Sequence, residues 1–408
     1  MSFQQGLSGL NAAAKNLDVI GNNVANASTV GFKQAQAQFA DVFASSLSGS
    51  GGSQVGIGVK VAQVTQQFTQ GNITSTSNPL DVAINGGGFF RMDNNGEITY
   101  QRNGQFQVDR MGFVVNSTGS KLTGYMADVN GVLATGAPTP LSINNSDLAP
   151  NITSEVNAVL NLNSGSTPID GVATPFNLND PTTYHNSTAV SVYDSLGNDQ
   201  TLQMFYVRRP AGTWDVYAAS DGTQIGAAPV ATLSFDTSGT LTTAMPLAAI
   251  NVPATATGAV NPFPITVDYT GTTQFGAAFS VNTLNQNGFT SGRLAGFDLG
   301  ADGIMLGRYT NGQSAVLGQV VLANFANLNG LQQLGNNQWA ETSISGAALV
   351  GPPDSGSLGV LQSKAVEDSN VDLTAELVNM ITAQRVYQAN AQTIKTQDAV
   401  MQTLVNLR

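Results

Sequence analysis

The 408-residue sequence contains no cysteine, one histidine and few charged residues. Without cysteine there are no disulfides, no thiolate metal ligands and no cysteine nucleophile. Lys and Arg number 15 and Asp and Glu number 26, so 10% of the chain is charged, where an ordinary soluble domain has ~25%. The net charge of −11, with no run of basic residues, argues against binding to a nucleic-acid backbone.

Long apolar runs are also missing. No stretch approaches the roughly 18 apolar residues of a membrane-spanning helix, and residues 1–30 lack a cationic leader, an apolar stretch and a small-residue cleavage site. We therefore expect no membrane insertion and no cleaved signal peptide. A protein of this kind that works outside the cytoplasm must be exported by another route.

Few residues suggest chemistry. His185 lies in a polar stretch and is interpreted as a solvated loop residue. Gly86-Gly87-Gly88 lacks the Gly-Lys-Ser/Thr of a phosphate-binding loop and is interpreted as a turn. Asp298 and Asp302 lack the ligand spacing of a calcium loop, which favours a turn. The sequence therefore predicts no catalytic residue, no metal and no cofactor.

Both ends of the chain carry a seven-residue apolar repeat. At the N-terminus it consists of Phe3, Leu10, Leu17 and Val24. A repeat of this period is typical of a coiled-coil seam. We therefore predict a helix over about residues 2–24.

The C-terminal repeat is longer. Its apolar positions are Leu373, Met380, Tyr387, Ile394 and Met401. Ser369 with Asp372 can cap the start of a helix, and residues 371–408 contain no Gly or Pro. At about 1.5 Å per residue this helix is roughly 55 Å long and the N-terminal helix roughly 35 Å. The two helices are expected to pair, and the excess length then needs apolar neighbours, most simply from other copies of the chain.

An uncharged polar set accompanies this repeat, namely Gln384, Gln388, Asn390, Gln392, Gln397 and Gln402. Two interpretations stay open. These residues form either a solvated face or a face that packs against or slides past copies of itself.

The middle of the chain has a different pattern. Alternating apolar residues are interrupted by turn pairs such as Asn95-Gly96, Asn103-Gly104 and Asn130-Gly131. These are hairpin signals, so the interior is predicted to be antiparallel β. If the two ends of the chain pair, the residues between them must loop out from this helical stem as nested domains. The sequence therefore predicts an α+β, multidomain fold in which the terminal helices form a coiled-coil stem. The Gly/Ser-rich segment 45–58 and the Gly/Pro/Ser-rich segment 346–359 look like paired connectors.

Four regions are predicted from these boundaries. They are a helical stem (1–30 with 362–408), an extended connector (31–70 with 347–361), an inner β domain (71–146 with 285–346) and an outer β domain (147–284).

Two motifs in the terminal segments carry a family resemblance. Residues 7–33 resemble the N-terminal signature of bacterial flagellar rod and hook axial proteins. Residues 369–395 resemble the paired C-terminal signature of the same family. The resemblance singles out five N-terminal positions, Asn22, Asn23, Asn26, Gly31 and Phe32.

The length and four interior motifs resemble the hook branch of this family. The motifs are Leu80-Asp-Val-Ala-Ile-Asn, Arg102-Asn-Gly-Gln-Phe, Leu122-Thr-Gly-Tyr and Leu317-Gly-Gln-Val-Val-Leu-Ala-Asn-Phe. The resemblance implies a non-enzymatic subunit of a curved, flexible tube that joins rod to filament, transmits torque and encloses an export channel. It also implies type III export without signal cleavage.

The partners implied by the resemblance are many copies of the same chain, the distal rod protein, the hook cap and the hook–filament junction proteins. The repeats add a hypothesis of their own, in which apolar stem residues pack within and between subunits. The candidates are Phe3, Leu7, Leu10, Leu17, Ile20, Val24, Leu373, Leu377, Met380, Tyr387, Ile394, Met401 and Val405. The alternatives are another axial component, such as a distal rod or hook-associated protein, and a secreted β-rich adhesin or glycan hydrolase.

Overall fold

The structure, a computed structural model, describes residues 2–42, 56–128, 131–143, 147–256 and 258–406. The chain divides into two units. The first contains residues 1–145, 296–308 and 314–408, and the second contains residues 146–295 with 309–313. Two helices and many strands give the α+β fold class expected from the sequence. The predicted connector 45–58 lies almost entirely outside the described residues.

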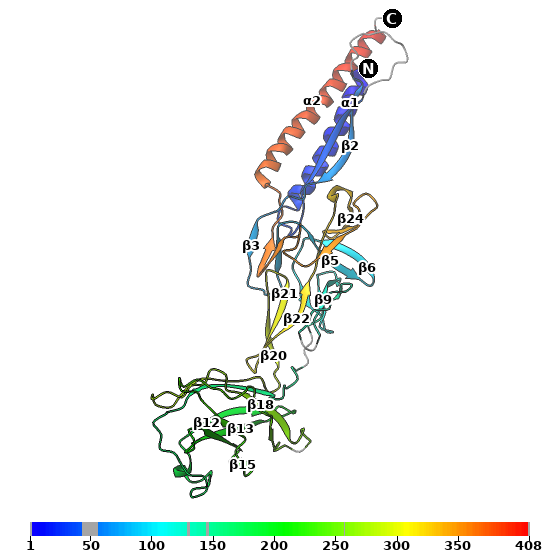
Figure 1. The fold of residues 1–408 in the computed structure, drawn as a ribbon. Coiled ribbons are helices and arrows are strands. Elements are labelled where there is room, and N and C mark those ends of the chain that lie inside the picture. The colour runs from blue at the N-terminus through cyan, green and yellow to red at the C-terminus, as the bar shows by residue number, and fades with distance from the viewer. Residues whose placement is uncertain (1, 43–55, 129–130, 144–146, 257, 407–408) are drawn as a thin grey trace. The chain divides into compact units, whose positions relative to one another are not determined.

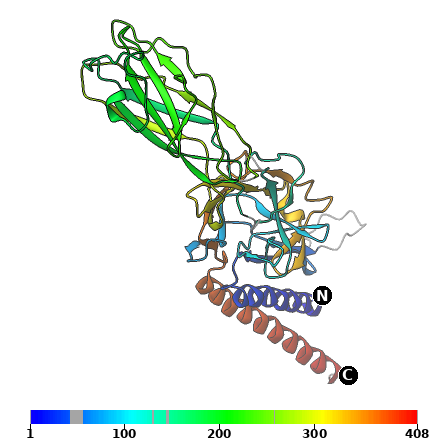
Figure 2. The same ribbon diagram turned by 90° about the horizontal axis from the view of Figure 1, so that it is seen from below.

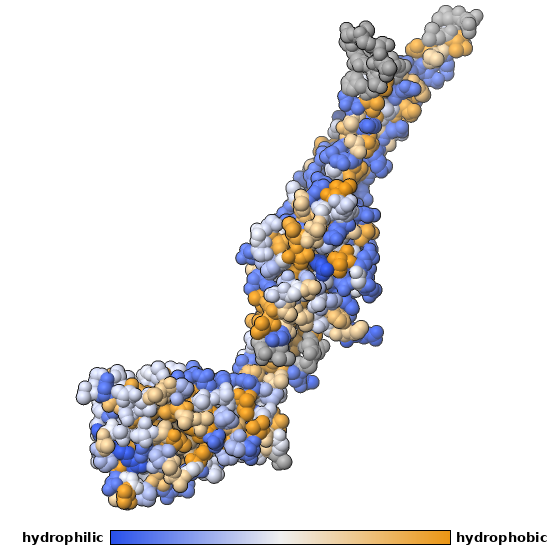
Figure 3. Space-filling view, turned by 45° about the vertical axis from the view of Figure 1, so that its right-hand side comes forward, coloured by the Kyte–Doolittle hydropathy of each residue, from blue (hydrophilic) through white to orange (hydrophobic). Residues whose placement is uncertain are grey.

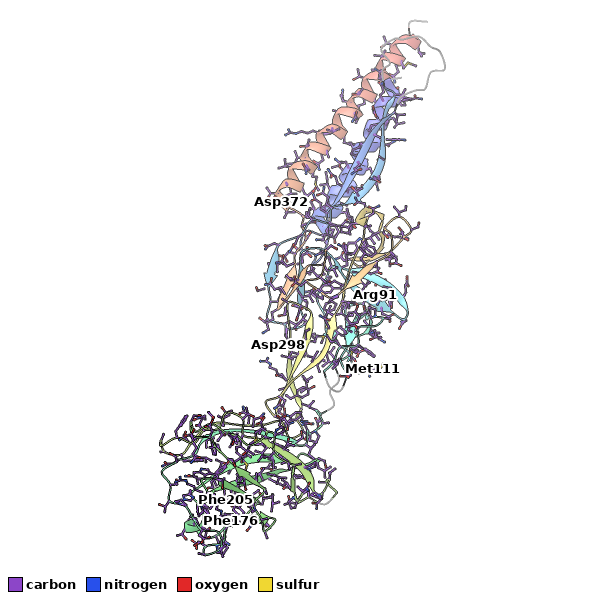
Figure 4. The ribbon with its side chains drawn as sticks, viewed as in Figure 1. Arg91, Met111, Phe176, Phe205, Asp298 and Asp372 are labelled. Carbon is purple, nitrogen blue, oxygen red and sulfur yellow. The ribbon has the colours of Figure 1, made fainter. Side chains whose placement is uncertain are left out.

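Both predicted helices are present in the first unit. Helix α1 spans Ser2–Ala25 and helix α2 spans Leu373–Asn406. The helices lie side by side with both chain termini at the same end, so they are antiparallel (Figures 1 and 2). Of the predicted pair Ser369 and Asp372, Asp372, labelled at the start of α2 in Figure 4, caps this helix, whereas Ser369 accepts the N–H of Val371 before the helix begins. Asp372 Oδ1 accepts the N–H groups of Thr374 and Ala375 at 2.9 and 3.1 Å.

A β-hairpin packs along α1. Strands β1 (Ala35–Val42) and β2 (Gly58–Gln66) are antiparallel partners. The Ser8 hydroxyl accepts the Val59 N–H at 3.2 Å, which fixes β2 against the helix (Figure 1). The hairpin therefore makes a third side of the stem, within the region predicted as an extended connector.

The remaining sheets of the first unit are mostly antiparallel, and their strands lie between α1 and α2 in the sequence. The main sheet has the path β20-β21-β22-β9-β5-β6-β25-β24, with β7, β8, β10, β23 and β26 attached, and two smaller sheets pair β27 with β4 and β28 with β3. The bounds are β3 (Ile73–Ser75), β4 (Val82–Asn85), β5 (Phe89–Asn94), β6 (Glu97–Gln101), β7 (Gln107–Val108), β8 (Val114–Val115), β9 (Lys121–Met126), β10 (Thr139–Pro140), β20 (Leu294–Leu299), β21 (Ile304–Tyr309), β22 (Ser314–Val320), β23 (Leu322–Asn324), β24 (Gln332–Gly335), β25 (Gln338–Ala340), β26 (Leu349–Gly351), β27 (Val360–Ser363) and β28 (Ala365–Glu367), with a 3₁₀ turn at Leu328–Gly330.

An aromatic cluster forms part of the core of the first unit. Phe89, Tyr100, Phe325 and Trp339 are buried together. Tyr100 and Phe325 meet edge to face with centroids 4.8 Å apart, and Phe89 meets Trp339 at 5.5 Å. Edge-to-face pairs of this kind add to the free energy gained from burial alone.

The second unit is a pair of β-sheets around a larger apolar core. One sheet has the path β12-β13-β14-β15 with β16 attached, and the other has the path β17-β18-β11-β19. The bounds are β11 (Glu155–Asn161), β12 (Asn186–Tyr193), β13 (Asp199–Arg208), β14 (Trp214–Ser220), β15 (Thr223–Ile225), β16 (Ala231–Leu233), β17 (Ile250–Val252), β18 (Phe263–Asp268) and β19 (Ser280–Gln286), with a 3₁₀ turn at Pro181–Thr183. One pair differs from the antiparallel prediction, since β11 and β18 run parallel. Residues 162–262 separate these two strands, enough chain for a crossover connection.

The single histidine is not the solvated loop residue that we predicted. His185 Nδ1 accepts the N–H of Arg208 at 3.1 Å, and Nε2 lies 2.7 Å from the Thr167 carbonyl. The ring meets Trp214 edge to face at 5.5 Å. The structure therefore gives His185 a structural role that links two segments of the second unit.

Gly86–Gly88 and Asp302 lie in turns, as predicted, whereas the turn predicted at Asp298 is wrong, because this residue lies in strand β20. The Gly86–Gly88 segment joins β4 to β5. Asp302 Oδ1 accepts the N–H of Ile304 at 3.1 Å, and Asp298 forms an ion pair with Arg308 at 3.1 Å. Within the described residues, no group of three or more His, Asp or Glu side chains is placed to hold a metal ion.

Two buried tyrosines predict an alkaline transition of the second unit. Burial raises the pKa of Tyr206 to about 12 and that of Tyr269 well above its ordinary value. The unfolded phenols titrate near pH ~10. The resulting stability is therefore complete below about pH 10 and is lost as the pH rises through about 12.

Phenolate absorbance and circular dichroism, followed together during an alkaline titration, test this expectation. Tyr206→Phe should remove one late-ionising phenol, while the tyrosines other than its hydrogen-bond partner Tyr269 titrate as before. Ionisation of Tyr206 near pH ~10 with the fold intact would contradict it.

Candidate functional site: the helical stem and its base

Glycines allow the two helices of the stem to approach closely. A Cβ atom at Gly9 would lie 2.7 Å from the Asn390 side chain, and one at Gly6 would lie 3.2 Å from Ile394. Ala12 and Ala13 continue the buried face of α1. The contact between α1 and α2 therefore uses small residues.

Only some of the predicted seam residues take part in this contact. Ile20 is buried, whereas Leu10, Leu17, Val24, Met380 and Ile394 are half-buried. The other candidates are exposed in the single chain, and they are Phe3, Leu7, Leu373, Leu377, Tyr387, Met401 and Val405. The predicted polar set is divided in the same way, because Asn390 and Gln397 are half-buried and the other glutamines are exposed.

The asparagines of the N-terminal motif end α1 and attach it to the hairpin. Asn26 donates from its side-chain nitrogen to the Asn22 carbonyl at 2.9 Å. Asn23 is buried and makes two bonds with Ala35: it donates to the carbonyl at 2.8 Å and accepts the N–H at 2.9 Å. These contacts give Asn22, Asn23 and Asn26 structural roles at the base of the stem.

Gly31 and Phe32 lead from the stem into the base. Gly31 has a φ of +71°, and a Cβ there would lie 2.5 Å from the Asn103 nitrogen, so only glycine fits. Its N–H donates to the Glu367 carbonyl at 2.8 Å. Phe32 is buried. Both residues therefore position the next residue, Lys33.

A buried charge cluster joins three distant parts of the chain at this base. Glu367 accepts from Lys33 Nζ at 2.6 Å and from Arg102 Nη1 at 3.0 Å. The Lys33 and Glu367 side chains have no exposed surface, and that of Arg102 is 4% exposed. Lys33 also donates to the Thr69 carbonyl at 2.8 Å, and the Gly71 N–H donates to Glu367 at 2.9 Å.

Neighbouring carbonyl groups stabilise the second cation of the cluster. Arg102 donates to the carbonyls of Gly86 at 2.7 Å and Ile84 at 3.4 Å, and its guanidinium lies 5.5 Å from the centroid of the Phe89 ring. Burial lowers the pKa of Lys33, against the raising effect of Glu367, and lowers that of Arg102. The cluster is enclosed by protein, so its role is to hold the chain ends and not to carry out chemistry.

Two residues of the charge cluster lie in motifs that carry the family resemblance. Lys33 ends the N-terminal signature, and Arg102 begins the motif Arg102-Asn-Gly-Gln-Phe. Sequence reasoning did not identify the roles of Lys33, Arg102 and Glu367 or the close approach at Gly6 and Gly9. A glycine pair three residues apart in a helix was the available signal for close approach.

Comparisons with known proteins identify the family of this chain. Four family profiles match in order along the sequence: "Flagella basal body rod protein" over residues 3–33, "Flagellar hook protein FlgE/F/G D1 domain" over 83–158, "Flagellar basal body protein FlaE D2 domain" over 161–289 and "Flagellar basal body rod FlgEFG protein C-terminal" over 362–407. Flagellar hook proteins FlgE of Salmonella typhimurium and Escherichia coli are each 46% identical, over all of this chain and all of theirs. The chain belongs to the flagellar hook protein family.

Hook family membership agrees with the fold. The crystal structure of the Helicobacter pylori hook protein FlgE2 matches 72% of this chain and 100% of its own, with a TM-score of 0.55 at 14% identity. The family is one of structural proteins, so the chain is a hook component of the flagellar basal body and not an enzyme. Neither described helix carries an apolar stretch that could cross a membrane.

The charge cluster predicts a large effect from a small substitution. Glu367→Gln leaves Lys33 and Arg102 buried without a compensating charge, which should lower the free energy of unfolding by about 3 kcal/mol. Urea unfolding followed by helical circular dichroism reports on the first unit, because both helices lie there.

Glu97→Gln is the matched control for this experiment, because Glu97 is exposed. It should change the unfolding free energy by less than ~0.5 kcal/mol. Equal midpoints for the two variants would show that the buried cluster does not hold the base of the stem.

Proposed function

We propose that the chain polymerises through its helical stem into the curved, flexible tube of the hook. The tube transmits torque from rod to filament and encloses the export channel. One observation carries the proposal: large apolar side chains are exposed along α2 of the single chain (Figure 3). They are Leu373, Leu377, Val378, Ile381, Val386, Tyr387, Val400, Met401 and Val405.

The lengths of the helices support contacts with other copies. Helix α2 has 34 residues and α1 has 24, so one helix cannot cover the other. In the polymer, the stem helices pair as a coiled coil and the predicted seam residues pack within and between copies. Each leucine buried in this way contributes ~1.5–3 kcal/mol, and several such contacts offset an association cost of roughly 4–15 kcal/mol.

The proposed domain roles follow the nested fold. The stem (1–30 with 362–408) forms the inner tube, the connector (31–70 with 347–361) joins it to the inner β domain (71–146 with 285–346), and the outer β domain (147–284) lies at larger radius. The polar, glycine-rich β surfaces suit weak, hydrated contacts that exchange as the tube bends. The ends of the tube contact the distal rod protein, the hook cap and the hook–filament junction proteins, and the subunit reaches them through the type III export apparatus.

Replacing one exposed leucine of α2 should impair assembly. Leu377→Gln leaves the single chain folded, because this side chain is already 44% exposed. Loss of one buried leucine should raise the critical concentration for polymerisation roughly tenfold or more. Sedimentation and electron microscopy of the purified full-length chain measure the effect.

Leu349→Gln provides a matched control, since Leu349 is 62% exposed on β26. Its polymers should form at the wild-type concentration. The proposal fails if both variants polymerise alike or if the wild-type chain forms no tubes.

A further inference from the structure

A groove runs between the two helices and the hairpin of the stem. Its volume is about 740 Å³. We call it the stem groove; small and apolar residues form most of its floor and walls, among them Ala13 and Ile20 of α1, Ala37 of β1, and Ala383 and Val386 of α2. None of its lining residues is Lys or Arg.

One carboxylate in the stem groove has an unused acceptor. Glu376 is 3% exposed and lines the groove. Its Oε1 accepts from Asn23 at 3.4 Å and from the Gln34 side chain. Its Oε2 is buried and receives no hydrogen bond from the described residues of the chain. A buried carboxylate oxygen without a donor is unfavourable, so the groove suits a ligand that brings a donor, above all a cation.

The opposite side of α2 carries a matching stripe. Val378 and Ile381 are 58% and 52% exposed, and Arg385 follows at the next helical position of the same face. Arg385 forms no ion pair with the described residues of the chain. Arg385 follows Glu376 by nine residues, which at about 3.6 residues per turn is two and a half turns, so it lies on the opposite side of α2 and points away from the groove of its own chain.

We propose that the stem groove of one copy receives the stripe Val378–Ile381–Arg385 from α2 of a second copy, with the Arg385 guanidinium donating to Glu376 Oε2. The proposal rests on the proposed function and identifies one contact within it. A contact between two different faces of the same helix is heterologous, and repeated heterologous contacts generate helical polymers.

Size and charge both support this occupant. A helix about 10 Å wide and two turns long occupies roughly 850 Å³. The groove volume of about 740 Å³ leaves room for the side chains of one ridge of such a helix, for example those of residues 378–385. The apolar residues of the stripe face the apolar walls, and its cation faces the only carboxylate among the groove's lining residues.

Disulfide trapping tests the contact directly, because the sequence contains no cysteine. Full-length chains carrying Asn16→Cys, in the groove wall, are mixed with chains carrying Ile381→Cys, polymerised and oxidised. We expect cross-linked pairs that join residue 16 to residue 381, identified by mass spectrometry of the linked peptides. The control pairs Asp18→Cys, exposed on α1 outside the groove lining, with Ile381→Cys and should give at least tenfold less product.

A second comparison tests the ion pair. Arg385→Gln should raise the critical concentration for polymerisation about tenfold, the effect of losing a charged hydrogen bond. Lys395→Gln, another exposed cation of α2, should leave that concentration unchanged.

The outcomes separate this inference from the proposed function. Tubes that form without cross-linking above the control, or that form equally well with Arg385→Gln and Lys395→Gln, overturn the groove contact and leave hook assembly intact. A wild-type chain that forms no tubes overturns both.

Discussion

The two buried ion pairs of the Glu367 carboxylate, with Lys33 and with Arg102, are the interaction on which the rest of the structure depends. Glu367 binds Lys33 from the segment after α1 and Arg102 from the end of β6, and its own strand leads into α2. A carboxylate without exposed surface between two cations is stable only when all three are in place. The cluster therefore holds the beginning, the middle and the end of the chain together at the base of the stem.

This buried base anchors two long helices in a chain that has few charged residues. The helices are anchored at one end, through Asn23 and the charge cluster, and extend from it with apolar side chains exposed on α2. Only 10% of the residues are charged, so few charged groups have to lose their solvent when copies of the chain come into contact. A surface of this kind is suited to contact with copies of the chain.

The helices and turns could be predicted because their signals are local. A seven-residue repeat and the cap at Asp372 define α2 without reference to the rest of the chain. The charge cluster could not be predicted in this way, because its ion pairs join residues 334 and 265 positions apart. The face of α1 that meets α2 was also missed, since Gly6 and Gly9 contribute through close approach and not through hydrophobicity. Likewise, the structural role of His185 depends on Arg208 and Thr167, which are distant in sequence.

Hydrogen exchange of α1 and α2 in the free chain and in the assembled tube is the most direct test of the central claim that the stem serves contact between copies. The account predicts that exchange along residues 2–24 and the second half of α2 is much slower in the tube than in the free chain, because contacts with other copies are present only in the tube. Equal protection in the two states would contradict it, because the stem would then be complete without its neighbours.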